Sequence, residues 1–198
     1  AQGIDGAAHA ATIDAGGQTI AVCGTGPDRV YPARHRDLAH RIASAGALVT
    51  EFPPGTPPLP EHFPRRNRII AGLSLGVLVI EAAARSGSLI TARLAGEQNR
   101  DVFAIPGSIH YPGARGCHAL IRDGATLVET ARDVLVVLAP HLEAPPGDGK
   151  LATLAETRPT PAMPRLSAVA GSTLSALGDA PVAFDALLSR SGLSVDQL

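Results

Sequence analysis

The sequence has little of several residue types, and each scarcity excludes a class of protein. Only two of the 198 residues are cysteine, and Cys23 and Cys117 lie far apart. They form neither a disulfide framework nor a metal quartet, so we expect buried thiols in a reducing compartment. No apolar run approaches the roughly 18 residues of a membrane span and no signal peptide opens the chain, so we expect a cytoplasmic protein without a membrane partner.

The sequence also has no large excess of charge of either sign, because its 17 basic residues nearly balance its 18 acidic ones and the net charge is −1. No global field therefore attracts a nucleic acid, and any basic surface has to be local. Lysine is nearly absent: Lys150 is the only one, and the other 16 basic residues are arginine. Arginine suits bidentate contacts with phosphate.

Short strand-like and helix-like segments alternate over residues 1–139. This alternation predicts an α/β fold with a parallel sheet and helices on both faces, in which ligands bind beyond the carboxyl ends of the strands. The predicted strands cover 19–23, 47–52, 77–82, 101–107 and 126–128, and the predicted helices cover 4–15, 33–45, 62–73, 88–99, 114–123 and 132–138.

The pattern stops at residue 140. Residues 140–165 contain six prolines and no hydrophobic period, which predicts a linker. Residues 166–198 follow with helices expected at 166–177 and 183–190 and a third beginning near Ser194, which suggests an incomplete helix-turn-helix or winged-helix unit; an unrelated helical tail is the alternative. The chain opens on AQGID and stops at GLSVDQL, and we expect it to be a piece of a longer protein.

Several enzyme signatures are missing. Gly24-Thr25-Gly26 lacks the third glycine of a dinucleotide fingerprint, and the sequence contains no G-x-S-x-G and no H-E-x-x-H. Asp5 and His9 stand one helical turn apart as an acid–base pair would, but a helix N-cap and a histidine on a helix face are the favoured interpretation. We therefore expect no catalytic residues, no metal and no cofactor.

One candidate binding element is RSGSLITA, residues 85–92, at the seam between a predicted strand and a predicted helix. Ser86 or Ser88 can cap the helix, and Gly87 lets a ligand approach the backbone closely. The free N–H groups of a helix start suit an anion. An ordinary strand–helix turn is the plainer alternative.

A second candidate is FPRRNRIIAGLS, residues 63–74, in which Arg65, Arg66 and Arg68 stand within four positions. On a helix, Arg65 and Arg68 share a face. Together with Arg85 they would border the anion-binding helix start, which predicts a phosphate groove rather than a merely solvated cluster.

These segments resemble a known family. GIDGAAH (3–9), YP (31–32), FPRRNRIIAGLS, EAAARSGSLITA (81–92), DVFAIPG (101–107) and GCHALIRDGA (116–125) are similar to the signature blocks of the DNA-processing protein A (DprA/Smf) family, in its order. The resemblance implies a Rossmann-like domain over 1–139, here without its first strand, then the linker 140–165 and an incomplete winged helix over 166–198. It places DNA contacts at Gly3, Asp5, Arg66, Asn67, Arg68, Ser86, Gly87 and Ser88, to which the residue pattern adds Arg85.

The resemblance further implies a homodimer that binds single-stranded DNA and hands it to the RecA recombinase during natural transformation, without being an enzyme. The alternative is a Rossmann-like nucleotide phosphoribohydrolase of the lysine-decarboxylase-like type. Those enzymes carry P-G-G-x-G-T-x-x-E, with a glutamate on the first turns of the helix. Residues 88–96 contain no acid, and Glu97 comes too late to replace it.

Overall fold

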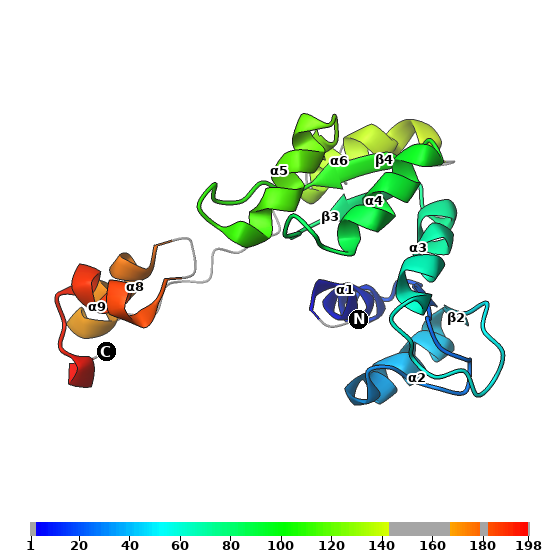
Figure 1. The fold of residues 1–198 in the computed structure, drawn as a ribbon, viewed down its shortest axis with the longest axis horizontal. Coiled ribbons are helices and arrows are strands. Elements are labelled where there is room, and N and C mark those ends of the chain that lie inside the picture. The colour runs from blue at the N-terminus through cyan, green and yellow to red at the C-terminus, as the bar shows by residue number, and fades with distance from the viewer. Residues whose placement is uncertain (1–2, 143–166, 179–181, 198) are drawn as a thin grey trace.

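The computed structural model describes residues 3–142, 167–178 and 182–197 (Figure 1). Helices and strands alternate through the first range, as the sequence predicts. The elements are α1 (Ile4–Asp14), β1 (Ile20–Val22), η1 (Ala33–His35), α2 (Arg36–Ala45), β2 (Ala47–Val49), α3 (His62–Leu73), β3 (Gly76–Val79), α4 (Ser88–Glu97), β4 (Asp101–Ala104), η2 (Pro112–Ala114), α5 (Arg115–Arg122), β5 (Thr126–Leu127), α6 (Ala131–Leu138) and η3 (Ala139–His141).

The predicted helices are confirmed to within a few residues, while the strands are shorter than predicted. The helix expected over 33–45 divides into the 3-10 turn η1 and α2. Gly46 ends α2, and a β-carbon at this position would collide with the carbonyl oxygen of Thr19, which precedes β1. The close approach of Gly46 to Thr19 brings the starts of β1 and β2 together.

The strands are all parallel, but in the described residues they form two sheets instead of the single sheet predicted. β1 pairs with β2, and β3, β4 and β5 form a second sheet in that order. The N–H of Cys23 donates to Val49 on β2, so the carbonyl of the preceding Val22 points to the opposite edge of β1. There it accepts a hydrogen bond from the Arg66 guanidinium. A side chain thus occupies an edge position that a neighbouring strand would need.

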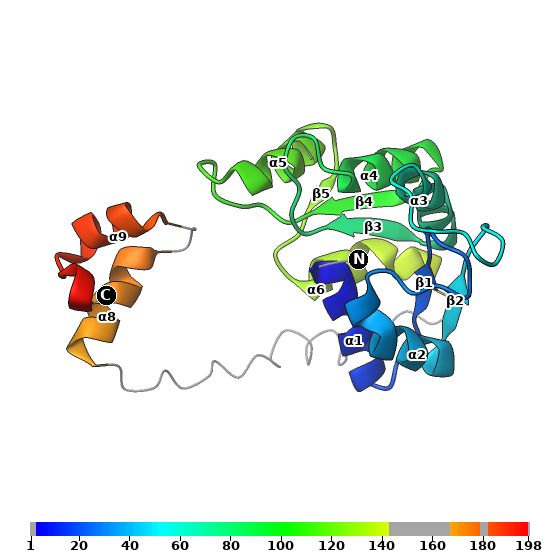
Figure 2. The same ribbon diagram turned by 60° about the horizontal axis from the view of Figure 1, so that its bottom comes forward.

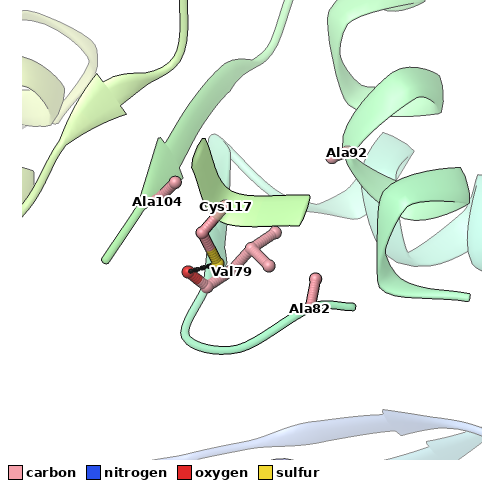
Figure 3. Close-up of a cluster of buried hydrophobic side chains, with 5 residues drawn as sticks. All are labelled: Val79, Ala82, Ala92, Ala104 and Cys117. Atoms are coloured by element: carbon pink, nitrogen blue, oxygen red, sulfur yellow. Dashed lines mark hydrogen bonds between the residues drawn. The ribbon is translucent and has the colours of Figure 1, made fainter. Parts of the chain in front are cut away.

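The buried core lies in the second sheet and its helices. Val79, Ala82, Ala92, Ala104 and Cys117 form one cluster, and Figure 3 shows the Cys117 thiol beside the carbonyl of Val79. Burial raises the pKa of this thiol, which is therefore an inert core group, as expected from the sequence. Figure 2 shows α4 and α5 on one side of this sheet and α6 on the other, which agrees with the predicted covering of both faces.

The later described residues form a small helical unit of α8 (Ala168–Leu177), α9 (Phe184–Ser191) and the 3-10 turn η4 (Val195–Gln197). The Ser167 hydroxyl caps α8 by accepting a hydrogen bond from the N–H of Ala170 at 3.2 Å. Helices α8 and α9 pack against each other, and Leu187 is the buried residue of α9. The predicted linker falls outside the described residues except for residues 140–142, of which 140–141 belong to η3.

Candidate anion-binding groove

A groove of about 880 Å³ brings together segments that are far apart in the sequence. It is lined by one side of α1, by β1 with the loop that follows, by parts of α2, β2 and α3, and by the stretch from β3 to the start of α4. Five of the nine predicted contact residues line it, namely Asp5, Arg66, Asn67, Gly87 and Ser88.

The first wall of the groove is α1. Gly3 occupies the N-cap with a φ of 80°, a backbone conformation that glycine adopts freely, and Asp5 lies in the first turn. Asp5 is therefore not the N-cap that the sequence suggested. One turn later, Nδ1 of His9 lies 2.7 Å from the hydroxyl oxygen of Thr19. Burial lowers the pKa of His9, and Asp5 partly opposes this shift.

Arg66 forms the floor beside α1. Its guanidinium donates to the carbonyl of Val22 and, through Nε at 3.1 Å, to Oδ1 of Asn67, while it lies 5.8 Å from the centre of the Phe63 ring. Burial lowers the pKa of Arg66, and the nearby Asp5 opposes this. Arg66 is thus held by protein groups as well as facing the groove.

The other two arginines of α3 share a helix face, as predicted, but that face turns towards the end of β2. The Arg68 guanidinium pairs with Glu51, and that of Arg65 lies 5.6 Å from the centre of the Phe52 ring. In the part of the chain that the structure describes, neither of them lines the groove, and neither does Arg85. A single arginine of the predicted cluster therefore reaches the site.

The start of α4 forms the opposite wall. Gly87 takes the N-cap position and Ser88 is the first helical residue, so neither Ser86 nor Ser88 is the predicted side-chain cap. Ser86 instead lies next to the wall, where its hydroxyl oxygen is 3.3 Å from the N–H of Ser88. No atom lies within 4 Å of the place where a β-carbon of Gly87 would stand, so the backbone is open to a ligand here.

The loop after β1 contributes Arg29 and Tyr31 to the groove, and the sequence predicted neither of them as a contact residue. The N–H of Gly55 donates to Asp28 at 2.7 Å, and the buried Thr25 hydroxyl donates to the carbonyl of Arg29 at 2.9 Å, so the loop is held in place. The ring of Tyr31 lies 5.7 Å from that of Phe63. The YP pair was the only signal in the sequence that could have pointed to this aromatic contact.

Two enzyme features are missing from the described residues, namely a cluster of metal ligands and an acid on the first turn of α4. Among the described residues, no three His, Cys, Asp or Glu side chains gather as a metal ion would require. The first turn of α4 contains no acid, and Glu97 at its other end pairs with Arg93 at 2.9 Å. In the described ranges no helix is both long and apolar enough to cross a bilayer.

The fold is that of a parallel α/β protein whose polar groups gather beyond the ends of its strands. The family model of DNA recombination-mediator protein A matches residues 1–139, and that of the DprA winged helix domain matches residues 157–198. The chain belongs to the DNA recombination-mediator protein A family, also called DprA or Smf.

Known relatives are longer than this chain. It is 56% identical over 136 residues to Protein Smf of Escherichia coli K12, covering 68% of the chain and 36% of that protein. The putative DNA processing protein DprA of Mycobacterium tuberculosis H37Rv is 41% identical over 199 residues, covering 100% of the chain and 46% of that protein. The chain therefore spans less than half the length of these relatives.

Two solved structures share the fold. The X-ray structure of DNA processing protein A from Streptococcus pneumoniae superposes with a TM-score of 0.64 at 53% identity, covering 69% of this chain and 48% of that one. The second is DNA processing protein A from Helicobacter pylori, whose structure is described in terms of its single-stranded DNA binding mode. It superposes with a TM-score of 0.57 at 26% identity, covering 62% of this chain and 57% of that one.

Proposed function

We propose that this chain binds single-stranded DNA in the groove and acts in recombination by passing the strand to RecA. The observation that carries the proposal is the convergence of Asp5, Arg66, Asn67, Gly87 and Ser88 from three helices onto one groove. We propose DNA contacts at these five residues and at the more remote Gly3, Arg68, Arg85 and Ser86.

The start of α4 is the proposed phosphate site. The N–H of Gly87 has no partner among the described residues, and that of Ser88 has only the long contact with Ser86. These groups point out of the positive end of the helix, where an anion is stabilised. A phosphate bound here would lie across the groove from the Arg66 guanidinium.

Aromatic side chains favour a single strand over a duplex. Tyr31 lines the groove with 56% of its surface exposed, and Phe63 lines it beside Tyr31. Unpaired bases stack on such rings, whereas the bases of a duplex are already stacked on one another. The groove therefore combines a phosphate contact with a surface for unpaired bases.

The alternative enzyme would need a carboxylate on the first turns of α4, and that turn has none. We therefore propose a binding protein and expect no release of free base from nucleoside monophosphates. Release of base from AMP above background, abolished in Glu81→Gln, would favour the phosphoribohydrolase instead.

We also propose a homodimer that works in the cytoplasm, where it would meet RecA. Helix α6 contains no buried residue and exposes 55% of Val136, which is consistent with a covering partner. The division into a Rossmann-like domain over 1–139, a linker over 140–165 and a partial winged helix over 166–198 is proposed in the same way.

The test of the proposed function is a titration of labelled oligo-dT and of a duplex of equal length, with the variants Gly87→Val and Gly96→Val. A β-carbon added at either glycine meets no other atom within 4 Å, so the two positions are matched. We expect oligo-dT to bind more tightly than the duplex, and Gly87→Val to weaken oligo-dT binding on the order of tenfold by blocking the helix start. Gly96→Val, at the far end of the same helix, should have no effect. Equal losses in the two variants, or equal binding of duplex and single strand, would contradict the proposal.

A further inference from the structure

The groove contains a carboxylate that its proposed ligand does not explain. Glu81 follows β3 by two residues, has an exposed side chain and lines the groove together with Gly87 and Ser88. A phosphate placed against this carboxylate would be repelled by its like charge. A DNA strand that places a phosphate at the start of α4 must therefore present a group other than a phosphate to Glu81.

The carboxylate of Glu81 is held in a fixed position. The Tyr111 hydroxyl donates to Oε1 at 2.8 Å, and this contact raises the pKa of Tyr111. The adjoining backbone is pinned as well, because the N–H of Ala82 donates to the carbonyl of Gly113 at 2.9 Å and the N–H of Gly116 donates to that of Ala82 at 2.7 Å. Oε1 also lies 2.8 Å from where a β-carbon of Gly113 would stand, so a larger residue there would displace the carboxylate.

The charge of Glu81 is not compensated by the protein, in contrast to that of the other groove carboxylate. Asp5 lies close enough to Arg66 to influence its pKa. Within the described ranges, by contrast, Glu81 has no arginine or histidine at ion-pair distance, and Oε2 has no hydrogen-bond partner. The carboxylate therefore has a free acceptor, which a ligand with an N–H group would satisfy.

We propose that Glu81 is a specificity-determining residue that accepts a hydrogen bond from the exocyclic amino group of a base. Cytosine offers its N4 amino group, a known partner of Glu. Thymine carries the O4 acceptor in the same place, and two acceptors, O4 and the carboxylate oxygen, would repel each other. The groove thus prefers cytosine to thymine. This inference rests on the proposed binding of single-stranded DNA.

The experiment is a competition between oligo-dC and oligo-dT of equal length at pH 7.5 and constant ionic strength, followed by fluorescence anisotropy. We expect the unmodified chain to prefer oligo-dC on the order of tenfold, the value of one good base contact. Glu81→Gln should reduce the preference to less than about twofold, because a glutamine amide can donate to O4 of thymine as well as accept from N4 of cytosine. Tyr111→Phe, which removes only the hydrogen bond to Oε1 of Glu81, should reduce the preference for oligo-dC in part.

The matched control is Glu97→Gln, which neutralises a carboxylate of the same region outside the groove and should leave the preference unchanged. If Glu81→Gln strengthens the binding of both oligonucleotides equally, Glu81 only repels phosphate and the inference is wrong. Equal affinities in the unmodified chain would also overturn it while leaving the proposed function intact. Binding of neither oligonucleotide would overturn the proposed function itself.

Discussion

The two sheets of this protein differ in how completely they are buried. The sheet of β3, β4 and β5 and the helices packed on it hold the core cluster and, among the described residues, the two largest fully buried side chains, Phe103 and Cys117. The sheet of β1 and β2 has a single buried residue, Val22, and Ile20 at its start is 54% exposed. The groove lies between these two halves, so a well-packed wall that carries the start of α4 faces a less buried wall that carries α1 and the loop after β1. This arrangement leads us to expect that the second sheet supplies most of the stability, and that variants in the half with the first sheet disturb the groove without unfolding the protein.

The largest expected effect tests the first part of this comparison. Phe103→Ala removes a ring that is 1% exposed, and it should lower the free energy of unfolding by about 3–5 kcal/mol through lost burial and the cavity left behind. Ile20→Ala, in the other sheet, should cost less than about 1 kcal/mol because its side chain is already half in water. Urea unfolding of both variants measures the difference. Similar losses at the two positions would mean that both sheets contribute equally to one core.

The second prediction concerns the other wall and the arginines of α3. Four arginines on one groove would give a slope of log K against log salt of roughly −3 for single-stranded DNA, whereas Arg66 and Arg29 alone would give about −1.4. We expect the smaller value. Arg66→Ala should flatten the slope by about 0.7, while Arg68→Ala should change it less, because Arg68 pairs with Glu51 outside the groove.

Arg132→Ala is the control for these variants, since Arg132 lies on α6, which does not line the groove in the described part of the chain. Titrations of labelled oligo-dT at several salt concentrations give the slopes. If Arg68→Ala and Arg66→Ala flatten the slope equally, the whole cluster contacts the strand, as the sequence alone suggested. If Arg132→Ala matches them, the cluster is only a solvated surface.

The helices and the strand order along the chain were predictable, because both depend on local periodicity. The prediction of α3 over 62–73 agrees with the observed His62–Leu73, where apolar residues recur at helical spacing. The division into two sheets was not predictable, since pairing between strands depends on contacts remote in sequence. Nothing in the residues around Val22 indicates that its outward carbonyl would be bonded to Arg66.

The sequence indicated correctly which segments line the groove, but it was less successful for the individual side chains. Helical spacing placed Arg65 and Arg68 on one face, but could not say whether that face or the one with Arg66 lines the groove. The helix start at Ser88 was predicted correctly, but its cap was misassigned, because any residue of the Ser-Gly-Ser segment can take the N-cap position. The start of α4 nevertheless lies in the groove, with Gly87 and Ser88 lining it.

The smallest expected effect distinguishes the two walls by their response to acid. His9 on α1 has its pKa lowered by burial, so it is neutral at pH 7 and the unfolded chain binds a proton more readily than the folded one. Its contribution to stability is therefore present above the ordinary value of 6.5 and is lost as the pH falls through the lower pKa of the folded state. A phosphate bound near His9 favours the charged form of its imidazole, so acid strengthens this contact although it destabilises the free protein. Lowering the pH from 7.5 to 5.5 should thus tighten oligo-dT binding by roughly threefold while it destabilises the free protein.

His9→Gln should remove this pH dependence, because His9 lines the groove and is the group whose pKa burial lowers. His40→Gln is the control, since His40 lies on α2 with an exposed side chain and does not line the groove in the described chain. Anisotropy titrations at constant ionic strength give the affinities, and thermal unfolding at the same pH values gives the stability of the free protein. If acid weakens DNA binding in parallel with stability, the α1 wall is simply unfolding. If acid tightens binding equally in His9→Gln, the phosphate lies too far from α1 to sense its charge, and the groove binds DNA mainly through the start of α4.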